Sequence, residues 1–327
     1  MRRLAPLTVV LALACGDTAA DDTTSSTTSS TGGGGAASGG GGASGGGGVA
    51  SGGGGSTSAG CPSCGDVVDL STPKSAGLVE ASGLAASGVH PGVFWAHNDS
   101  GDSARLFAFS EDGAARGTYD VAGLDPVDWE DMSRGPCADP AKSCLYIGDI
   151  GDNGRSRSTY TLVRVEEPAA LAPGGATLTP EVFTFQYPDG SHNAEALMVH
   201  PQTGVVYIAT KSARATRVYA FPTPLDATQT MTLEDVGQAT VPDLLALVTG
   251  GDIHPAGDGV LLRTYSTVWY YPIARGQTVG AALAGTPCAL PTPVEGQGET
   301  VAFTLTGDGY RTLSEGAGEV LHGVSCR

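Results

Sequence analysis

Carboxylic acids recur at one position of a repeated pattern in this sequence. Directly before five short apolar segments the chain reads SG, ED, EA, GD and ET, which supply the acids Glu130, Asp131, Glu195, Asp252 and Glu299. Strand interiors contain few acids, so a purely structural role explains this recurrence poorly. Carboxylates held close together repel one another, and they either raise their pKa values or share a cation. Calcium takes six to eight oxygen ligands, so these acids predict a calcium site, with calcium as the cofactor.

Two loops contain a second acidic pattern. Residues 97–102 read HNDSGD and residues 148–154 read GDIGDNG, so each loop has two aspartates three positions apart, a glycine between them and an asparagine. In one interpretation these are oxygen-rich calcium loops with Asp99 and Asp149 as ligands. In the other they are tight turns, because Asp, Asn and Gly adopt left-handed backbone conformations and bond to nearby backbone groups. EF-hand spacing is absent, since no glutamate stands at the twelfth position.

The sequence lacks the common motifs of nucleophilic and nucleotide-dependent enzymes. It has no G-x-S-x-G elbow, no HExxH, no P-loop and no GxGxxG after a strand. Metal-assisted hydrolysis is the catalytic mechanism that the residues could support. In that case His97 or Asp149 would act as the base, and Lys211 and Arg263 would hold an anionic substrate. A hydrogen-bonding role for His97 is the alternative, because a lone histidine argues weakly for a metal or catalytic site.

A repeat with a period near fifty residues must position these side chains. Three copies read LAASGVHPGVFWAHND, LMVHPQTGVVYIATKS and DIHPAGDGVLLRTYST, and two more lack the His-Pro turn. Each copy has a short apolar strand, a turn, a β-branched or aromatic strand and then a third strand. The period predicts an all-β β-propeller of five four-stranded blades. A sixth blade would require a degenerate copy near residues 168–192, and a β-sandwich is the weaker alternative because it does not require this period.

The last copy of the repeat ends after its third strand, so the ring of blades needs a fourth strand from elsewhere in the chain to close. The segment DVVDLS at residues 66–71 can supply the missing fourth strand, which would remove the open sheet edges. In a propeller the innermost strand of each blade lines the central channel, so the acids would form a ring of carboxylates at one mouth. Polar residues at the ends of the second strands would converge there too, which predicts a site for a small polar ligand.

Six cysteines follow Cys15, an even number that favours disulfides in an exported protein. Cys137 and Cys144 bracket a short polar loop, and we expect them to pair. Three pairings remain open for the other four, which are Cys61, Cys64, Cys288 and Cys326. The CPSC segment also has redox or zinc spacing, but the chain has no second CxxC. We therefore favour a bridge between the domain's ends, from Cys61 or Cys64 to Cys326.

The N-terminal residues predict export. Residues 1–15 read MRRLAPLTVVLALAC, a secretory signal whose apolar run is too short to span a bilayer. The segment ALAC resembles the lipobox of bacterial lipoproteins, which implies a lipid on Cys15; simple secretion is the alternative. Residues 16–60 are nearly all Gly, Ser, Thr and Ala, a composition that predicts a disordered tether. The propeller domain would then occupy residues 61–327.

The opening strand motif EASGLA at residues 80–85 resembles that of bacterial secreted β-propellers of the phytase-like and gluconolactonase (NHL-like) group. The likeness extends over residues 66–327. It implies calcium in or near the channel and hydrolysis of phosphate esters or lactones, although many proteins with this fold only bind partners. Because five blades are visible and those enzymes have six, we carry over no catalytic residue from the resemblance.

The formal net charge of −17 argues against nucleic acid and against adsorption to anionic lipid. We therefore expect a monomeric lipoprotein held at the outer membrane or cell surface by its lipid alone, or a periplasmic or secreted protein if Cys15 is not modified. Its propeller would bind a small polar ligand or an envelope protein with calcium. The alternatives are a calcium-dependent hydrolase of phosphoesters or lactones and a protein-interaction scaffold.

Overall fold

The computed structural model describes residues 60–327. The predicted signal peptide, lipidated Cys15 and the tether up to residue 59 lie outside the described residues. The domain is a five-bladed β-propeller, which confirms the fold predicted from the repeat. The innermost strands of successive blades contact one another around a ring. They are β2 (Ala81–Ala86), β6 (Trp129–Pro136), β11 (Ala194–Val199), β16 (Val248–Ile253) and β20 (Ala302–Phe303).

Each blade is an antiparallel sheet that runs outward from its inner strand. Blade 1 continues with β3 (Val93–Asn98), β4 (Arg105–Ser110) and β5 (Ala115–Val121), and blade 2 with β7 (Ser143–Asp149), β8 (Tyr160–Glu166) and β10 (Pro180–Gln186). Blade 3 continues with β12 (Val206–Thr210), β13 (Thr216–Ala220) and β15 (Glu234–Ala239), and blade 4 with β17 (Gly259–Thr264), β18 (Val268–Pro272) and β19 (Cys288–Leu290). Blade 5 contains β21 (Gly309–Thr312) and β22 (Leu321–Ser325).

The segment in which a sixth blade could have been hidden forms sheet edges. The short strand β9 (Thr177–Leu178) pairs in parallel with β5, and β10 is the fourth strand of blade 2. A second short strand, β14 (Met231–Thr232), adds a parallel edge to β10. Residues 168–192 therefore join two neighbouring blades, and the blade count is five.

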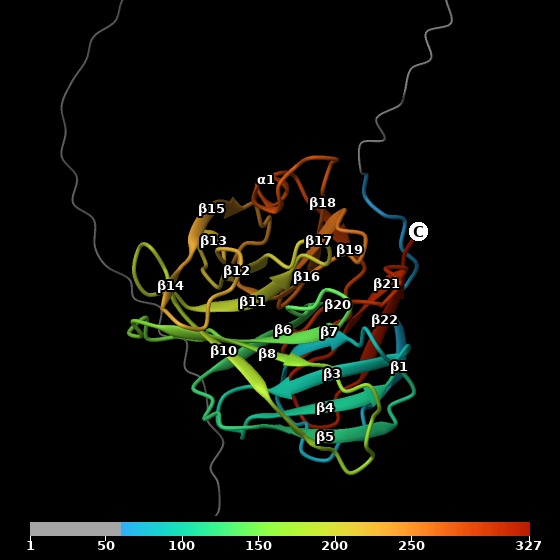
Figure 1. Ribbon diagram of the computed structural model, residues 1–327. Helices are drawn as coiled ribbons and strands as arrows, with labels where there is room; N and C mark the ends of the chain where they lie inside the picture. The colour runs from blue at the N-terminus through green and yellow to red at the C-terminus, as the bar shows by residue number, and fades with distance from the viewer. Residues whose placement is uncertain (1–59) are drawn as a thin grey trace, which may run out of the picture. The chain divides into compact units, whose positions relative to one another are not determined.

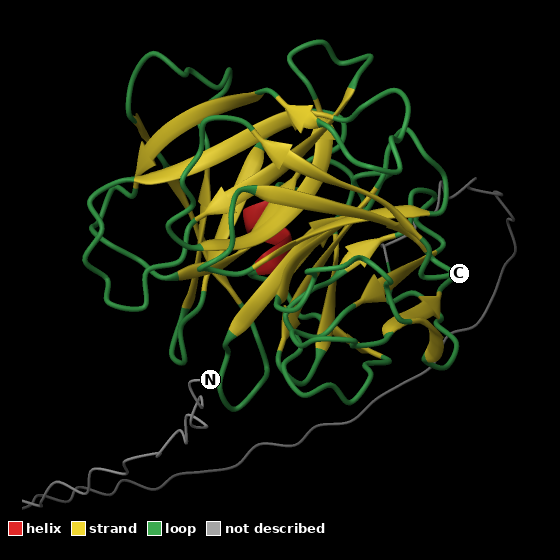
Figure 2. Ribbon diagram, turned by 90° about the horizontal axis from the view of Figure 1, so that it is seen from below, coloured by secondary structure: helices red, strands yellow, loops and turns green. Residues whose placement is uncertain are grey.

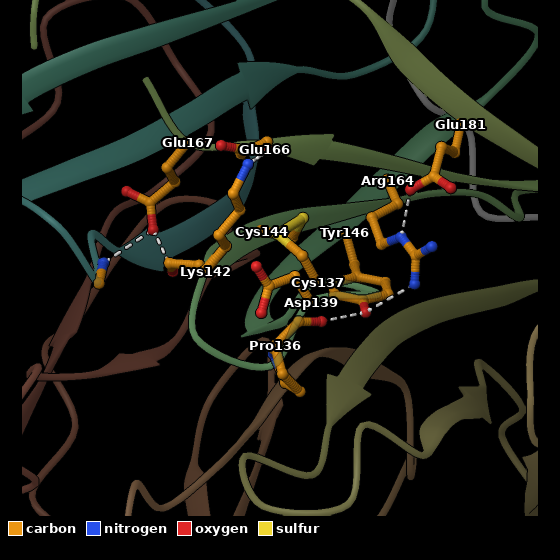
Figure 3. Close-up of a disulfide and its surroundings, with 12 residues drawn as sticks. Pro136, Cys137, Asp139, Lys142, Cys144, Tyr146, Arg164, Glu166, Glu167 and Glu181 are labelled. Carbon is orange, nitrogen blue, oxygen red and sulfur yellow. Dashed lines mark hydrogen bonds and ion pairs between the residues drawn. A yellow bond between two sulfur atoms is a disulfide. The ribbon is translucent and has the colours of Figure 1, made fainter. Parts of the chain in front are cut away.

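The N-terminal strand β1 (Val68–Ser71) pairs with β22 and completes blade 5, which confirms the predicted closure (Figure 1). Two disulfides, Cys64–Cys326 and Cys61–Cys288, tie the start of the domain to blades 5 and 4. The predicted Cys137–Cys144 pair is also present. Figure 3 shows it next to Tyr146, whose hydroxyl donates to the carbonyl of Pro136. Both cysteines of CPSC are bonded elsewhere, so they form neither a redox pair nor a zinc site.

The core lies between the blades, where apolar side chains of adjacent sheets pack against each other. Between blades 1 and 2, for example, Trp95 and Tyr119 meet Met132 and Ile147, and all four are fully buried. Among residues 60–327 the structure has one short helix, α1 (Val279–Leu283), drawn in red in Figure 2. No helix in that range is long and apolar enough to cross a membrane.

Candidate functional site

Four of the five inner strands carry a β-bulge at the same place, near the start of the strand. The register shifts between Ala81 and Gly83, and it does so again at the matching positions of β6, β11 and β16. In blade 5 the Gly298–Ser314 bridge places Glu299 at the same position. We call the five residues at this position the bulge residues; they are Ser82, Glu130, Glu195, Thr249 and Glu299. Three of the five are glutamates, so the acidic ring has members from blades 2, 3 and 5, and hydroxyls replace them in blades 1 and 4.

A second ring at the same end follows the second strands. Its backbone N–H groups donate to the carbonyls of residues that precede the inner strands: Asp99 to Glu80 at 2.8 Å, Lys211 to Asn193 at 3.0 Å and Glu315 to Gln297 at 3.0 Å. The five residues of this ring are Asp99, Ile150, Lys211, Tyr265 and Glu315. We call this end of the propeller the mouth; it comprises the bulge residues, this ring and the loops before the inner strands.

Three carboxylates at the mouth lie close enough together to share one cation. Oxygen atoms of Asp99, Asp128 and Glu130 lie within 4.8 Å of one another. Asp128 is in the loop before β6, and its carbonyl accepts from the N–H of Gly151 at 3.2 Å. A Cβ atom on Gly151 would stand 2.2 Å from Glu130 Oε1 and 2.3 Å from Asp128 Oδ2. Only glycine lets the backbone approach both carboxylates this closely.

This group of carboxylates fits a hard divalent cation. Its donors are all carboxylate oxygens, the ligands that calcium and magnesium prefer, and it includes no histidine or cysteine that would favour zinc. Burial raises the pKa of Glu130 well above its usual range, and the nearby carboxylates of Glu195 and Asp99 raise it further. Burial also raises the pKa of Asp128. A bound cation would relieve this repulsion.

Lys211 is the basic residue of the mouth ring, and it is held in place by neighbours. Its ammonium forms an ion pair with Glu195 and donates to the hydroxyl of Tyr265 at 2.6 Å. The nitrogen also lies 4.8 Å from the centre of the Tyr265 ring. Burial lowers the pKa of Lys211, but the attraction of Glu195 outweighs this and leaves the pKa above its usual value. Lys211 is therefore a fixed positive charge among carboxylates.

Two of the three bulge glutamates have no partner. Glu130 and Glu299 are each 6% exposed, and neither carboxylate forms a hydrogen bond or an ion pair with any residue in the range 60–327. Glu195, by contrast, binds Lys211 and accepts from Asn193 at 3.3 Å. Burial raises the pKa of Glu299 to about 7, with the charges of Glu195 and Glu315 adding to the effect and Lys211 opposing it. Neither carboxylate is among the fully buried side-chain atoms that lack a partner, so their oxygens remain accessible and both are candidates for ligand contact.

Two of the predicted metal ligands serve instead to join the inner strands. Asp131 accepts from the backbone N–H groups of Met132 and Leu197 at 2.8 Å and of Gly251 at 3.1 Å, which links three blades. Asp252 accepts from Phe303 N at 2.9 Å and from its neighbour Ile253. Asp131 is buried and Asp252 is half-buried, and desolvation raises the pKa of Asp252 to about 6. Among residues 60–327 neither belongs to the group of acids that could share a cation.

Most acids of the two Asp-Gly loops form hydrogen bonds or ion pairs that stabilise their turns. Asp149 accepts from the backbone of Val127 at 2.9 Å and pairs with Arg157 at 2.8 Å. Asp152 accepts from the backbone of Ser156 and Arg157, and Asp102 pairs with Arg105. Asp99 accepts from the N–H of its neighbour Ser100, but it differs from the other three acids in belonging to the carboxylate group at the mouth. Turn chemistry thus accounts for one acid in the first loop and for both acids in the second.

Two of the predicted catalytic candidates lie beneath the mouth. His97 is fully buried, its Nδ1 lies 2.8 Å from the carbonyl of Asn98, and burial lowers its pKa. Arg263 is also fully buried, where it pairs with Glu295 at 2.5 Å and donates to the carbonyl of Thr300 at 3.1 Å. Of the four predicted catalytic candidates, Lys211 is the one that belongs to the mouth ring and presents its charge there. Of the His-Pro histidines, His200 and His254 bond within their turns, as His254 does with Asp258 at 2.5 Å, whereas His90 Nε2 lies 2.8 Å from the carbonyl of Pro168.

Asp128 and Gly151 are site residues that the sequence reasoning missed. Asp128 stands two residues before Glu130, at the position that Glu80 occupies in blade 1. Aligning the two copies of the repeat could therefore have identified Asp128 as a residue of the mouth. The role of Gly151 depends on how closely two loops approach, which no local pattern reveals.

Comparisons with known proteins do not place the chain in a family. No protein-family model matches the chain, and no curated protein matches it. Among solved structures, the chain is similar to one in a nidogen–laminin complex, with 12% identity, a TM-score of 0.43 and coverage of 72% of this chain and 73% of the other. It is also similar to a luciferin-regenerating enzyme, with 10% identity, a TM-score of 0.43 and coverage of 81% and 95%. The fold assignment rests on the strand order.

Proposed function

We propose that the propeller binds a small polar ligand at its mouth with the help of a divalent cation, for which calcium is the best fit. The observation that carries this proposal is the group formed by Asp99, Asp128 and Glu130, with oxygen atoms within 4.8 Å of one another. Three carboxylates would hold calcium and leave coordination positions open, because calcium takes six to eight oxygens. Hydroxyl, carbonyl or phosphate oxygens of a ligand would fill those positions.

The rest of the mouth supports a polar ligand. The hydroxyl of Tyr265 and the ammonium of Lys211 present donors, and the unpartnered carboxylate of Glu299 presents an acceptor. Donors and acceptors on rigid strand ends fix a ligand's orientation. We further propose that the protein is exported and held at the cell envelope by a lipid on Cys15. Three disulfides in the domain support an oxidising compartment.

Thermal unfolding of the full chain, in millimolar calcium and then in chelator, tests the cation. Calcium at a hundred times its Kd would add about 2.7 kcal/mol of stability. We expect Asp128→Asn to abolish this upward shift in Tm. Glu234→Gln is the matched control, since it removes one negative charge from the outer strand β15. The absence of a calcium effect on the unchanged protein would refute the cation proposal.

A calcium-dependent hydrolase of phosphoesters or lactones is the second candidate, and one observation favours it. The pKa of Glu299, at about 7, suits a group that accepts and returns a proton near neutrality. Calcium would supply positive charge to polarise the substrate oxygen. Turnover of a chromogenic phosphate monoester and of a sugar lactone tests this. If the protein is such an enzyme, the pH profile of kcat bends near 7 and Glu299→Gln removes the bend.

A further inference from the structure

Exposed apolar side chains gather on the loops of the mouth. Of the large apolar residues that are exposed in the range 60–327, most lie before an inner strand or after a second strand: Val79, Val127, Leu244, Leu245, Tyr265 and Val294. Val89 is at the opposite end of blade 1, and Val68 and Leu70 are on the edge strand β1. The mouth therefore combines charged groups with exposed apolar side chains on the surrounding loops.

Three of these residues stand on two neighbouring loops that are well anchored. Leu244 is 98% exposed and Leu245 57% exposed, in the loop before β16; Val294 is fully exposed in the loop before β20. The first loop is held by Asp243, which accepts from the hydroxyls of Thr264 and Thr267. The second is held by Glu295 through its bond to Arg263. The loops are therefore fixed by polar contacts while their apolar side chains project outward.

Glu299 lies in the same loop as Val294, before β20. It is more than nine-tenths buried and has no partner among the described residues. The mouth also shows how it holds an ammonium group, because Lys211 lies between the carboxylate of Glu195 and the hydroxyl and ring of Tyr265. Carboxylates outnumber this single lysine at the mouth, so a second ammonium would find an unpaired acid.

We propose that the mouth binds a segment of a partner protein that inserts a lysine side chain beside Glu299 while apolar neighbours of that lysine pack on Leu244, Leu245 and Val294. This inference rests on the proposed function only in placing the binding site at the mouth. The acidic surface, with a net charge of −17 for the chain, attracts a basic segment and repels an anionic membrane. A protein partner therefore fits this surface better than a lipid bilayer.

Calorimetric titration of the full chain with two short peptides tests the proposal. The first is an acetylated Gly-Leu-Lys-Leu-Gly amide, and in the second norleucine replaces lysine. In chelator, we expect the lysine peptide to bind at least about tenfold more tightly, because only it can form the charged contact. Glu299→Gln and the double variant Leu244→Asp, Leu245→Asp should each weaken its binding by about tenfold. Val89→Asp and Glu234→Gln are the matched controls and should leave it unchanged.

Equal binding of the two peptides, or unchanged binding to Glu299→Gln, would overturn the proposal. Sedimentation with vesicles of phosphatidylcholine and phosphatidylglycerol in equal parts tests the membrane alternative. Vesicle binding that is lost in the Leu244→Asp, Leu245→Asp variant, without discrimination between the peptides, would replace the protein partner by a bilayer. Asp128→Asn separates this inference from the proposed function: it should abolish the effect of calcium on Tm and leave peptide binding intact.

Discussion

The carboxylate of Asp131 in β6 accepts a hydrogen bond of 3.1 Å from the backbone N–H of Gly251 in β16, two blades away. The same oxygen accepts from Leu197 in β11. Replacing Asp131 with asparagine would place an amide N–H₂ against one of these donors. We therefore expect Asp131→Asn to lower the free energy of unfolding in urea by about 2–4 kcal/mol. The effect of calcium on Tm should persist; if it is lost while stability is kept, Asp131 is a metal ligand after all.

Replacing Gly151 tests the fit of the backbone against the carboxylates. In Gly151→Ala the new Cβ would overlap Glu130 Oε1 and Asp128 Oδ2, so the two acids must move apart. We expect the affinity for calcium, measured by titration calorimetry, to fall by at least about tenfold. Gly154→Ala is the matched control in the same loop, since the nearest atom to its Cβ would be Ser156 Oγ at 3.6 Å. Equal affinity in the two variants would contradict the site.

The raised pKa of Glu299 predicts a pH dependence of stability. An acid whose pKa rises on folding destabilises the folded state when it is charged, so its penalty grows as the pH rises from its usual 4.5 through about 7. Glu299→Gln has no such penalty. In chelator, the variant should gain up to about 3 kcal/mol over the unchanged protein between about pH 5 and about pH 8, measured by urea unfolding. A difference that stays constant with pH would show that Glu299 titrates normally.

The disulfides should contribute unequally to stability. Cys64–Cys326 joins residues 262 positions apart, whereas Cys137–Cys144 spans 7 positions. A longer loop loses more entropy when it is closed in the unfolded chain, although Cys61–Cys288 already constrains most of the same loop. We expect Cys64→Ser with Cys326→Ser to lower the free energy of unfolding by roughly 3–5 kcal/mol, and Cys137→Ser with Cys144→Ser by about 2 kcal/mol. Urea unfolding under non-reducing conditions measures both; equal losses would contradict the loop-length argument.

The blade count could be predicted because each blade repeats the same local pattern of apolar strands and turns. The predicted ring of acids was less complete, for a physical reason. In a strand, adjacent side chains face opposite ways, and a bulge changes which of two neighbours faces which side. The sequence pair Glu130–Asp131 therefore did not reveal that Glu130 points to the mouth and Asp131 to the neighbouring strands.

Long-range pairing explains the remaining differences. Arg263 was predicted at the mouth because it ends a second strand, but its partner Glu295 is 32 residues further along, in the loop before β20. Asp128 joins the carboxylate group through the meeting of two loops from different blades. Contacts of this kind leave no periodic trace in a sequence, so they became visible only with the fold.

The pairing of β1 with β22 also determines how the domain would respond to mechanical load. If residues before 60 anchor the chain to a surface, a pulling force enters the domain at Cys61 and Cys64. Covalent bonds at these two residues pass the force to blades 4 and 5 before it reaches the hydrogen bonds between β1 and β22. Under tension, β1 would therefore stay paired with β22 as long as both disulfides remain oxidised. After reduction, the same force would act directly on the hydrogen bonds between β1 and β22 and could separate the two strands.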